Sequence, residues 1–307
     1  MSAIEVEHIS RSYGEVLALD DINFNVEEGE LFGLIGPDGA GKSTLFRILT
    51  TLLIADKGKA RVVGHDVVEN YKDIRKKVGY MPGRFSLYQD LSVEENLSFF
   101  ATIFGTTIKE NYDLVKDIYI QIEPFKKRLA GKLSGGMKQK LALCCALIHK
   151  PEVLFLDEPT TGVDAVSRKE FWDMLQSLKK KNIAILVSTP YMDEASLCDR
   201  IGLIQKGKIL KIDKPQQMMN DFKKPLYAIK TNETYNTLQY LRQQDFTESV
   251  LPFGEYLHLI TRERLNTETI KIHLKQKGFT VSEVKEIKPT VEDIFLDLSD
   301  NEESLIK

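Results

Sequence analysis

The chain has 307 residues, and its 42 Lys+Arg against 45 Asp+Glu give a net charge of −3 at pH 7. This length suffices for about two domains, and the near balance of charge argues against a general attraction to nucleic acid, so no nucleic-acid partner is expected. The 3 cysteines, Cys144, Cys145 and Cys198, show no metal-ligand spacing and indicate a reducing compartment.

The N-terminal segment is predicted to form antiparallel strands. Residues 4–12 and 16–26 alternate between apolar and polar side chains, with Glu27-Glu28-Gly29 as a turn after them. The N-terminus lacks a charged-then-apolar leader. The longest apolar run, residues 141–148, is far shorter than the roughly 20 residues that span a bilayer. Any membrane crossing is therefore expected in another subunit.

A glycine-rich segment follows an apolar run at 31–35. Its residues are Gly36, Pro37, Asp38, Gly39, Ala40, Gly41, Lys42, Ser43 and Thr44. The glycines let the backbone curl so that N–H groups point at phosphate oxygens, and the helix predicted over 45–53 offers its positive N-terminus. Lys42 would reach the β- and γ-phosphates, and the Ser43 hydroxyl would ligate Mg²⁺. The segment therefore predicts a site for a nucleoside triphosphate.

A second motif, Leu133-Ser134-Gly135-Gly136-Met137-Lys138-Gln139-Lys140, opens a predicted helix. Downstream, an apolar strand at 153–156 ends in Asp157-Glu158-Pro159-Thr160. A Ser-Gly-Gly at a helix start is often only a cap, but here it stands between a phosphate loop and a strand that ends in two carboxylates. The arrangement resembles the ATP-binding subunit of an ABC transporter, and the resemblance covers residues 1 to about 220.

The resemblance implies an α/β fold, namely a P-loop NTPase core with an antiparallel β-subdomain and a helical signature subdomain. It implies that ATP is bound by the loop at 36–44 and that Tyr13 stacks on the adenine, a contact that uses the flat face of the ring. Asp157 would hold Mg²⁺ together with Ser43, and Glu158 would polarise the attacking water as the catalytic base.

In this family two nucleotide-binding domains dimerise head to tail. Ser134, Gly135 and Gly136 would therefore contact the γ-phosphate held by the partner's lysine, at a helix N-terminus. The resemblance leaves open whether this chain pairs with a second copy or with a different chain. A lone monomer is expected to hydrolyse ATP poorly, since half of each site lies on the other chain.

Two positions depart from the family pattern. The family's glutamine after the strand that ends in Tyr80-Met81-Pro82 is Gly83 here, and the family's histidine after the strand at 185–189 is Pro190. By resemblance, the missing glutamine would have sensed Mg²⁺ and the attacking water. Proline offers neither a side-chain donor nor an N–H, so the γ-phosphate loses its usual contact at position 190. The site of Lys42 is therefore expected to bind ATP and to cleave it slowly.

Residues 92–130 are predicted to be mostly helical, with Ser92 as the N-cap and Glu95 three residues later completing a capping box. By resemblance this is the helical subdomain on which the membrane subunit docks. Some rings of an aromatic cluster in this segment are expected to lie in the core and others on the docking surface. The sequence does not assign individual rings to either place. The rings are those of Phe85, Tyr88, Phe99, Phe100 and Phe104.

Beyond residue 220 the pattern changes, so the predicted domains are 1–220 and 221–307. Two strand–helix units around a hairpin predict a small α+β C-terminal domain, and His258 and His273 in it are expected to be surface or packing residues. The predicted strands are 226–230, 249–250, 256–260 and 280–287, and the predicted helices are 234–242, 265–277 and 290–298. The closing segment 289–298 resembles the accessory domain of bacterial ABC-2-type exporter ATPases.

These observations together predict an ATP-binding, Mg²⁺-dependent ATPase subunit of an export-type ABC system. Its expected partners are a membrane-spanning ABC-2-type permease and a second nucleotide-binding domain, and its expected location is the cytoplasmic face of the cell membrane. One alternative is a hydrolysis-poor partner in an asymmetric heterodimer. A less favoured alternative is a soluble ABC ATPase that acts on ribosomes or DNA.

Overall fold

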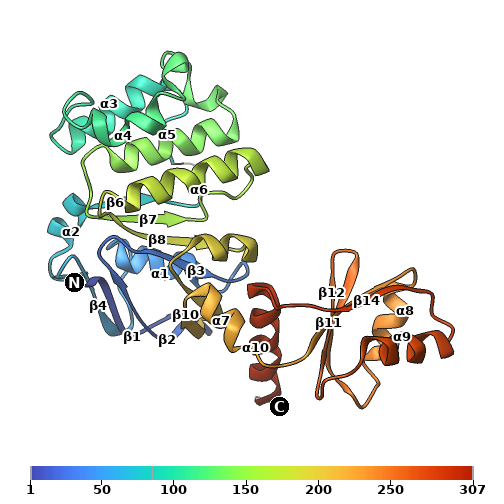
Figure 1. Ribbon diagram of the computed structural model, residues 1–307. Coiled ribbons are helices and arrows are strands. Elements are labelled where there is room, and N and C mark those ends of the chain that lie inside the picture. The colour runs from blue at the N-terminus through green and yellow to red at the C-terminus, as the bar shows by residue number, and fades with distance from the viewer. Residues whose placement is uncertain (1, 85, 306–307) are drawn as a thin grey trace. The chain divides into compact units, whose positions relative to one another are not determined.

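The computed structural model describes residues 2–84 and 86–305 (Figure 1). Contacts divide the chain into two compact units, Met1–Lys214 and Pro215–Lys307. Helix α7 (Pro215–Asp221) opens the second unit and packs against α10 (Val291–Leu305) in it. The boundary placed at residue 220 from the sequence falls inside α7.

The first unit is built on a six-stranded sheet with the strand order β10-β9-β3-β8-β7-β6. All neighbours pair in parallel except β10, which is antiparallel to β9. The central strands are continuous apolar runs that are fully buried, as expected for a parallel sheet covered on both faces. The strands are β3 (Leu31–Ile35), β6 (Val78–Met81), β7 (Val153–Asp157), β8 (Ala184–Thr189), β9 (Arg200–Gln205) and β10 (Lys208–Asp213).

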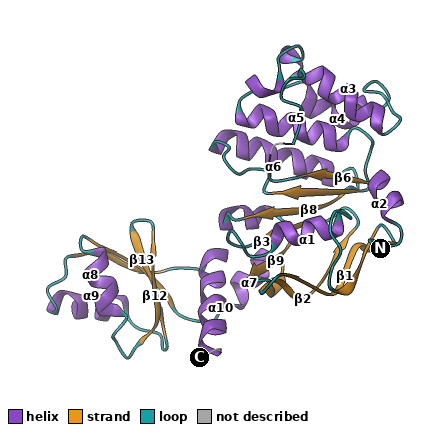
Figure 2. Ribbon diagram, turned by 180° about the vertical axis from the view of Figure 1, so that it is seen from behind, coloured by secondary structure: helices purple, strands orange, loops and turns teal. Residues whose placement is uncertain are grey.

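A four-stranded antiparallel sheet, with the order β2-β1-β4-β5, packs on one face of this core. Helix α1 (Lys42–Leu49) lies between the two sheets, and its buried Leu45 and Phe46 share a core cluster with residues of both (Figure 2). The predicted N-terminal hairpin is present as β1 and β2. The strands of this sheet are β1 (Ser2–Tyr13), β2 (Val16–Glu27), β4 (Lys57–Val62) and β5 (His65–Asp66).

A helical layer covers the other side of the six-stranded sheet, with α6 in contact with β3 and β8 and with α5 packed on α6 (Figure 1). The predicted capping box is confirmed, because Ser92 Oγ accepts a hydrogen bond from the Glu95 N–H at 3.3 Å and Glu95 Oε2 accepts one from the Ser92 N–H at 2.8 Å. The helices are α2 (Tyr71–Lys77), α3 (Val93–Ile103), α4 (Tyr112–Tyr119), α5 (Gly135–Leu147) and α6 (Ala165–Lys179), with 3₁₀ helices η1 (Glu123–Phe125), η2 (Ala130–Lys132) and η3 (Met192–Leu197).

The aromatic cluster of the helical layer lies mostly at its surface. Tyr88 and Phe99 are exposed, while Phe100 and Phe104 are half-buried. The Phe99 ring packs edge to face with those of Tyr88 and Phe100, with ring centroids 4.8 and 5.5 Å apart. Phe85 lies outside the described residues. The described rings therefore form an aromatic surface that is only partly drawn into the core.

The second unit contains an antiparallel sheet with the order β12-β13-β11-β14. The chain order strand, helix, strand, strand, helix, strand is that of a split βαβ fold, in which two helices cover one face of the sheet. Tyr227, Leu257 and Leu274 contribute to its separate apolar core. The elements are β11 (Leu226–Thr231), α8 (Thr234–Leu241), β12 (Thr247–Phe253), β13 (Tyr256–Thr261), α9 (Thr267–Gln276) and β14 (Val281–Glu286), followed by α10.

His258, expected at the surface or in packing, is buried and has a charged partner. Its Nδ1 lies 2.6 Å from Asp293 Oδ1, and its ring stacks on Phe253. Burial alone would raise the pKa of the Asp293 carboxyl, but hydrogen bonds from His258 and Thr290 outweigh it and the pKa is lowered. The pair therefore fixes the start of α10 against β13.

Among the described residues, no helix combines the length and the apolar character that crossing a bilayer requires.

Candidate nucleotide-binding site

The loop between β3 and α1 requires glycine at its two ends. At Gly36, an added Cβ would lie 2.1 Å from the Ile204 carbonyl oxygen. At Gly41, whose φ of +105° is itself in the glycine-favouring region, a Cβ would lie 2.4 Å from the Ala18 carbonyl oxygen. The backbone of the loop therefore lies in close contact with the neighbouring strands β2 and β9. Only glycine leaves room for this contact at positions 36 and 41.

The N-terminus of α1 is suited to bind an anion. The first N–H groups of any helix lack intrahelical partners and carry the positive end of the helix dipole. The first turn of α1, which includes Ser43 and Thr44, contains no acidic residue that would repel a phosphate. Pro37, Asp38 and Gly39 lie exposed at the tip of the loop.

Lys42 places its ammonium group inside the curl of this loop. The side chain is only 3% exposed, and Nζ donates hydrogen bonds to the carbonyl oxygens of Gly36 at 2.8 Å and Pro37 at 2.9 Å. Its third close neighbour is Glu158 Oε1 at 3.2 Å. The structure therefore brings together the predicted phosphate lysine and the predicted catalytic carboxylate, which lie far apart in the sequence.

One serine of β8, Ser188, contacts both the Asp157 carboxylate at the end of β7 and the backbone N–H of the next residue, Glu158. Ser188 Oγ donates to Asp157 Oδ1 at 2.7 Å and accepts from the Glu158 N–H at 3.0 Å. Glu158 adopts a φ of +51°, a conformation that is strained for a residue with a side chain. Ser188 was not singled out in the sequence, because a serine inside an apolar strand carries no motif of its own.

The oxygen atoms of Ser43 and Asp157 suit an Mg²⁺ ion that is bound together with a nucleotide. Ser43 supplies a hydroxyl and Asp157 a buried carboxylate, both of them the oxygen ligands that Mg²⁺ prefers. The described residues contain no cluster of three or more His, Cys, Asp or Glu side chains able to hold a metal alone. A metal here would therefore take its remaining ligands from phosphate oxygens and water, as is usual for Mg²⁺.

Gly83 and Pro190 lie beside these groups. A Cβ at Gly83 would stand 3.1 Å from the Asp157 carbonyl oxygen and 3.8 Å from Asp157 Oδ2, so a side chain at this position would lie next to the Asp157 carboxylate. Pro190 directly follows Thr189, whose carbonyl oxygen accepts a hydrogen bond from the Gly36 N–H at 3.3 Å. Both departures from the family pattern therefore border the site itself.

The signature residues are not brought to the loop of their own chain. Ser134 caps α5, and its Oγ accepts a hydrogen bond from the Met137 N–H at 3.4 Å. A Cβ at Gly136 would lie 2.6 Å from Ser167 Oγ at the start of α6, and one at Gly135 would lie 3.5 Å from the Gly162 carbonyl oxygen. The signature and the segment after Glu158 thus form one continuous surface.

Tyr13 lies at the end of the β1–β2 hairpin and is 43% exposed. Arg11 stacks over its ring at 5.4 Å. The hairpin approaches the phosphate loop through Ala18 of β2, which contacts Gly41 as described above. An exposed aromatic face is thus available on the element that flanks the loop.

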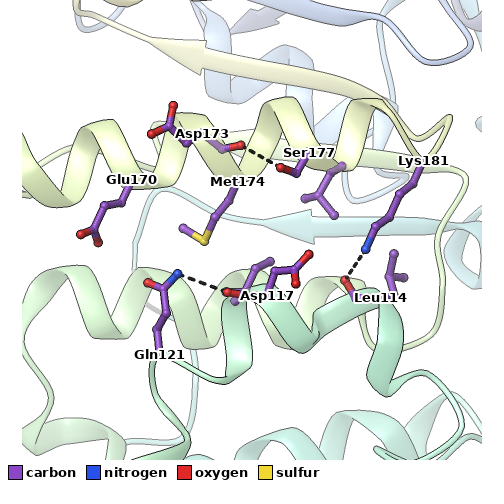
Figure 3. Close-up of a pocket in the computed structure, with 10 residues that line it drawn as sticks. Leu114, Asp117, Gln121, Glu170, Asp173, Met174, Ser177 and Lys181 are labelled. Atoms are coloured by element: carbon purple, nitrogen blue, oxygen red, sulfur yellow. Dashed lines mark hydrogen bonds between the residues drawn. The ribbon is translucent and has the colours of Figure 1, made fainter.

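A separate pocket of about 320 Å³ lies between α4 and α6. Figure 3 shows Asp117 and Gln121 on one side of it and Glu170, Asp173 and Met174 on the other. The lining carries the carboxylates of Asp117, Glu170 and Asp173 against the single ammonium group of Lys181, a balance of charge that disfavours a phosphate chain.

Comparison with known proteins agrees with this geometry. A family profile described as "ABC transporter" matches residues 19–161. A probable multidrug ABC transporter ATP-binding protein of Escherichia coli (strain K12) is 40% identical over 219 residues, which are 71% of this chain and 38% of that protein. This chain therefore spans well under half the length of that relative.

One other relative matches over nearly its whole length, and a solved structure matches over most of this chain. A Nod factor export ATP-binding protein I of Rhizobium sp. (strain N33) is 32% identical over 304 residues, which are 98% of both chains. The solved structure of an ATP-binding subunit of an ABC transporter superposes with a TM-score of 0.65 at 26% identity, covering 72% of this chain and 93% of that one. With a phosphate loop, two adjacent carboxylates and a signature helix in the expected places, the chain belongs to the family of ABC transporter ATP-binding subunits.

Proposed function

We propose that this chain is the ATP-binding subunit of an export-type ABC transporter, which binds ATP with Mg²⁺ and drives a separate ABC-2-type membrane permease. The observation that carries the proposal is the contact of Lys42 with Glu158 at the mouth of the phosphate loop. The relatives named for multidrug transport, Nod factor export and doxorubicin resistance support the direction of transport.

The site would act mainly by holding the Lys42 ammonium group against the γ-phosphate and the Glu158 carboxylate near the attacking water. An ammonium group has three protons, and the Gly36 and Pro37 carbonyls already take two of them. A γ-phosphate in the loop would take the third in place of Glu158 and leave that carboxylate to orient a water. The water oxygen then bonds to the γ-phosphorus, the bridging oxygen leaves with ADP, and Glu158 accepts the water proton.

A second nucleotide-binding domain would complete the site. Ser134 and Gly135 are exposed beside Gly162, with Gly136 buried behind them, so this helix start would be available to a γ-phosphate bound by another chain. In the same way the Lys42 site would receive the signature of its partner. The exposed ring of Tyr13 would stack on the adenine.

The permease would dock on an apolar groove of about 430 Å³ beside β6, α3 and α5. Its lining includes Leu52, Phe100 and Ile103, of which Leu52 is 58% and Ile103 59% exposed. Burial, with the nearby Asp157 charge, raises the pKa of Tyr80 to about 12, so this lining phenol stays neutral. A groove of this kind, mostly apolar with the Arg75 guanidinium in its lining, suits an apolar segment of a partner. Docking there would place the chain on the cytoplasmic face of the membrane.

The charge variant Ile103→Glu is expected to abolish this docking. A carboxylate forced into an apolar interface without a partner loses several kcal/mol of hydration, enough to dissociate the complex. The measurement is co-purification of a polytopic membrane protein with the tagged chain from detergent-solubilised membranes. Ile120→Glu is the matched control, because Ile120 is 53% exposed on the same helical layer and does not line the groove.

Retention of the membrane protein by Ile103→Glu, at the level of the control, would contradict the docking site. Recovery of ribosomes or DNA in place of a membrane protein would favour a non-transport ABC ATPase and would contradict the proposed function itself.

Gly83 and Pro190 favour a second candidate, a hydrolysis-poor subunit of an asymmetric heterodimer. In that arrangement the efficient site combines the lysine of the other ATPase chain with Ser134, Gly135 and Gly136 of this one. The slow site combines Lys42 with the signature of the other chain. Glu158 is retained, which argues against a complete loss of hydrolysis at the Lys42 site.

A further inference from the structure

A buried carboxylate outside the motifs joins three segments of the nucleotide site. Glu194, in η3, is 2% exposed. Its Oε1 accepts hydrogen bonds from Thr160 Oγ1 at 2.8 Å and from Arg168 Nε at 3.0 Å, and its Oε2 accepts one from Thr189 Oγ1 at 2.5 Å. Every short contact to this carboxylate therefore comes from a donor, and the ionised form satisfies them all.

The three donors to Glu194 come from segments of the chain to which different functions are assigned. Thr189 ends β8, and its carbonyl oxygen holds the N–H of Gly36 in the phosphate loop at 3.3 Å. Thr160 lies two residues after Glu158, in the segment that leads to Gly162 beside Gly135. Arg168 projects from α6, whose first turn carries Ser167 against Gly136. Glu194 is thus the point at which the phosphate loop, the catalytic segment and the signature surface meet.

The same group also fixes the loop that carries Pro190. The Tyr191 N–H donates to Thr189 Oγ1 at 3.0 Å, and the Arg168 guanidinium stacks over the Tyr191 ring at 4.2 Å. The residues on both sides of position 190 are therefore held by partners of Glu194. Because Pro190 has no donor of its own, its loop depends on these contacts for its position.

We propose that Glu194 is a positioning residue for ATP hydrolysis, which couples the Gly36 end of the phosphate loop to residues 160–164 on the surface presented to the second nucleotide-binding domain. The inference rests on the proposed function. Buried charged hydrogen bonds hold their partners in one geometry, and a shift of about 1 Å near a reacting group costs roughly 10²-fold in rate.

The test is steady-state ATP hydrolysis by the assembled transporter with Glu194→Gln. The amide keeps the shape of the side chain but turns one acceptor into a donor against Thr160, Arg168 or Thr189. The kcat is expected to fall about 10- to 100-fold while KM for ATP and the ATP affinity of the purified chain change less than about twofold. Asp193→Asn is the matched control, because Asp193 also pairs with Arg168 but its side chain is 75% exposed.

Thr160→Val and Thr189→Val provide a second test of the proposal, because each removes a hydrogen bond to Glu194 and leaves its carboxylate in place. Each is expected to lower kcat, and combining either with Glu194→Gln is expected to add little, because all three act through one network. Additive effects, or a Glu194→Gln transporter with normal kcat and only a lowered thermal midpoint, would overturn the inference. Failure of the wild-type chain to bind ATP would instead overturn the proposed function.

Discussion

Lys42→Ala is expected to weaken ATP binding more than any other single change in the chain. The substitution removes a cation that is 3% exposed and fixed by two backbone carbonyls inside the phosphate loop. Loss of one member of a buried charge pair costs about 2–5 kcal/mol, which corresponds to roughly 30-fold or more in Kd. It also leaves the Glu158 carboxylate facing the phosphates without compensation, which adds repulsion.

The measurement is equilibrium binding of ATP to the purified chain, with and without Mg²⁺. Lys140→Ala is a suitable control, since Lys140 is also a poorly exposed, ion-paired lysine, bonded to Glu170 at 2.6 Å in the signature helix. The control is expected to bind ATP normally. Equal affinity of Lys42→Ala and the wild-type chain, with both folded, would show that ATP binds elsewhere.

The second large effect is expected from introducing the glutamine and the histidine that the family pattern has at positions 83 and 190. The double variant Gly83→Gln with Pro190→His should raise turnover at the Lys42 site by roughly 10²–10³, the usual contribution of a group that stabilises the transferring phosphoryl. The structure accommodates the change at position 83. Gly83 is not in the left-handed region, and its side chain would point toward Asp157 Oδ2, with the Asp157 carbonyl needing to yield by a few tenths of an ångström.

Gly83→Ala with Pro190→Ala is the matched control, because it adds the same Cβ at position 83 and removes the same ring at position 190 without an amide or an imidazole. It should give no gain. If the double variant folds, binds ATP and hydrolyses it no faster than this control, then the absence of these two groups does not limit the reaction.

Much of the fold was accessible from the sequence because its strongest signals are local. The loop at 36–44, the buried strand before Asp157 and the capping box at Ser92 and Glu95 each depend on residues that are close in the chain. The structure shows these elements where they were predicted. The roles assigned to the site residues stay predictions, although the contact between Lys42 and Glu158 is what those roles require.

The rest depended on contacts between distant residues of ordinary type. Thr160 and Glu194 are 34 positions apart, and neither belongs to a pattern that marks it as a partner of the other. The same holds for His258 and Asp293, 35 positions apart: the histidine was expected at the surface or in packing, and it is buried in packing with a hydrogen bond to Asp293 that the sequence did not indicate. Pairings of this kind follow from the topology of the sheets, which periodicity alone does not specify.

Turnover of MgATP by the purified chain alone is the most direct test of the central claim, that this site binds ATP but cleaves it slowly. We expect saturable ATP binding with a kcat well below about 1 s⁻¹, the low end for typical enzymes. Addition of a second ATPase chain that carries the glutamine and the histidine should raise the rate. Brisk turnover by the chain alone, abolished by Glu158→Gln, would contradict the claim and indicate an ordinary homodimer.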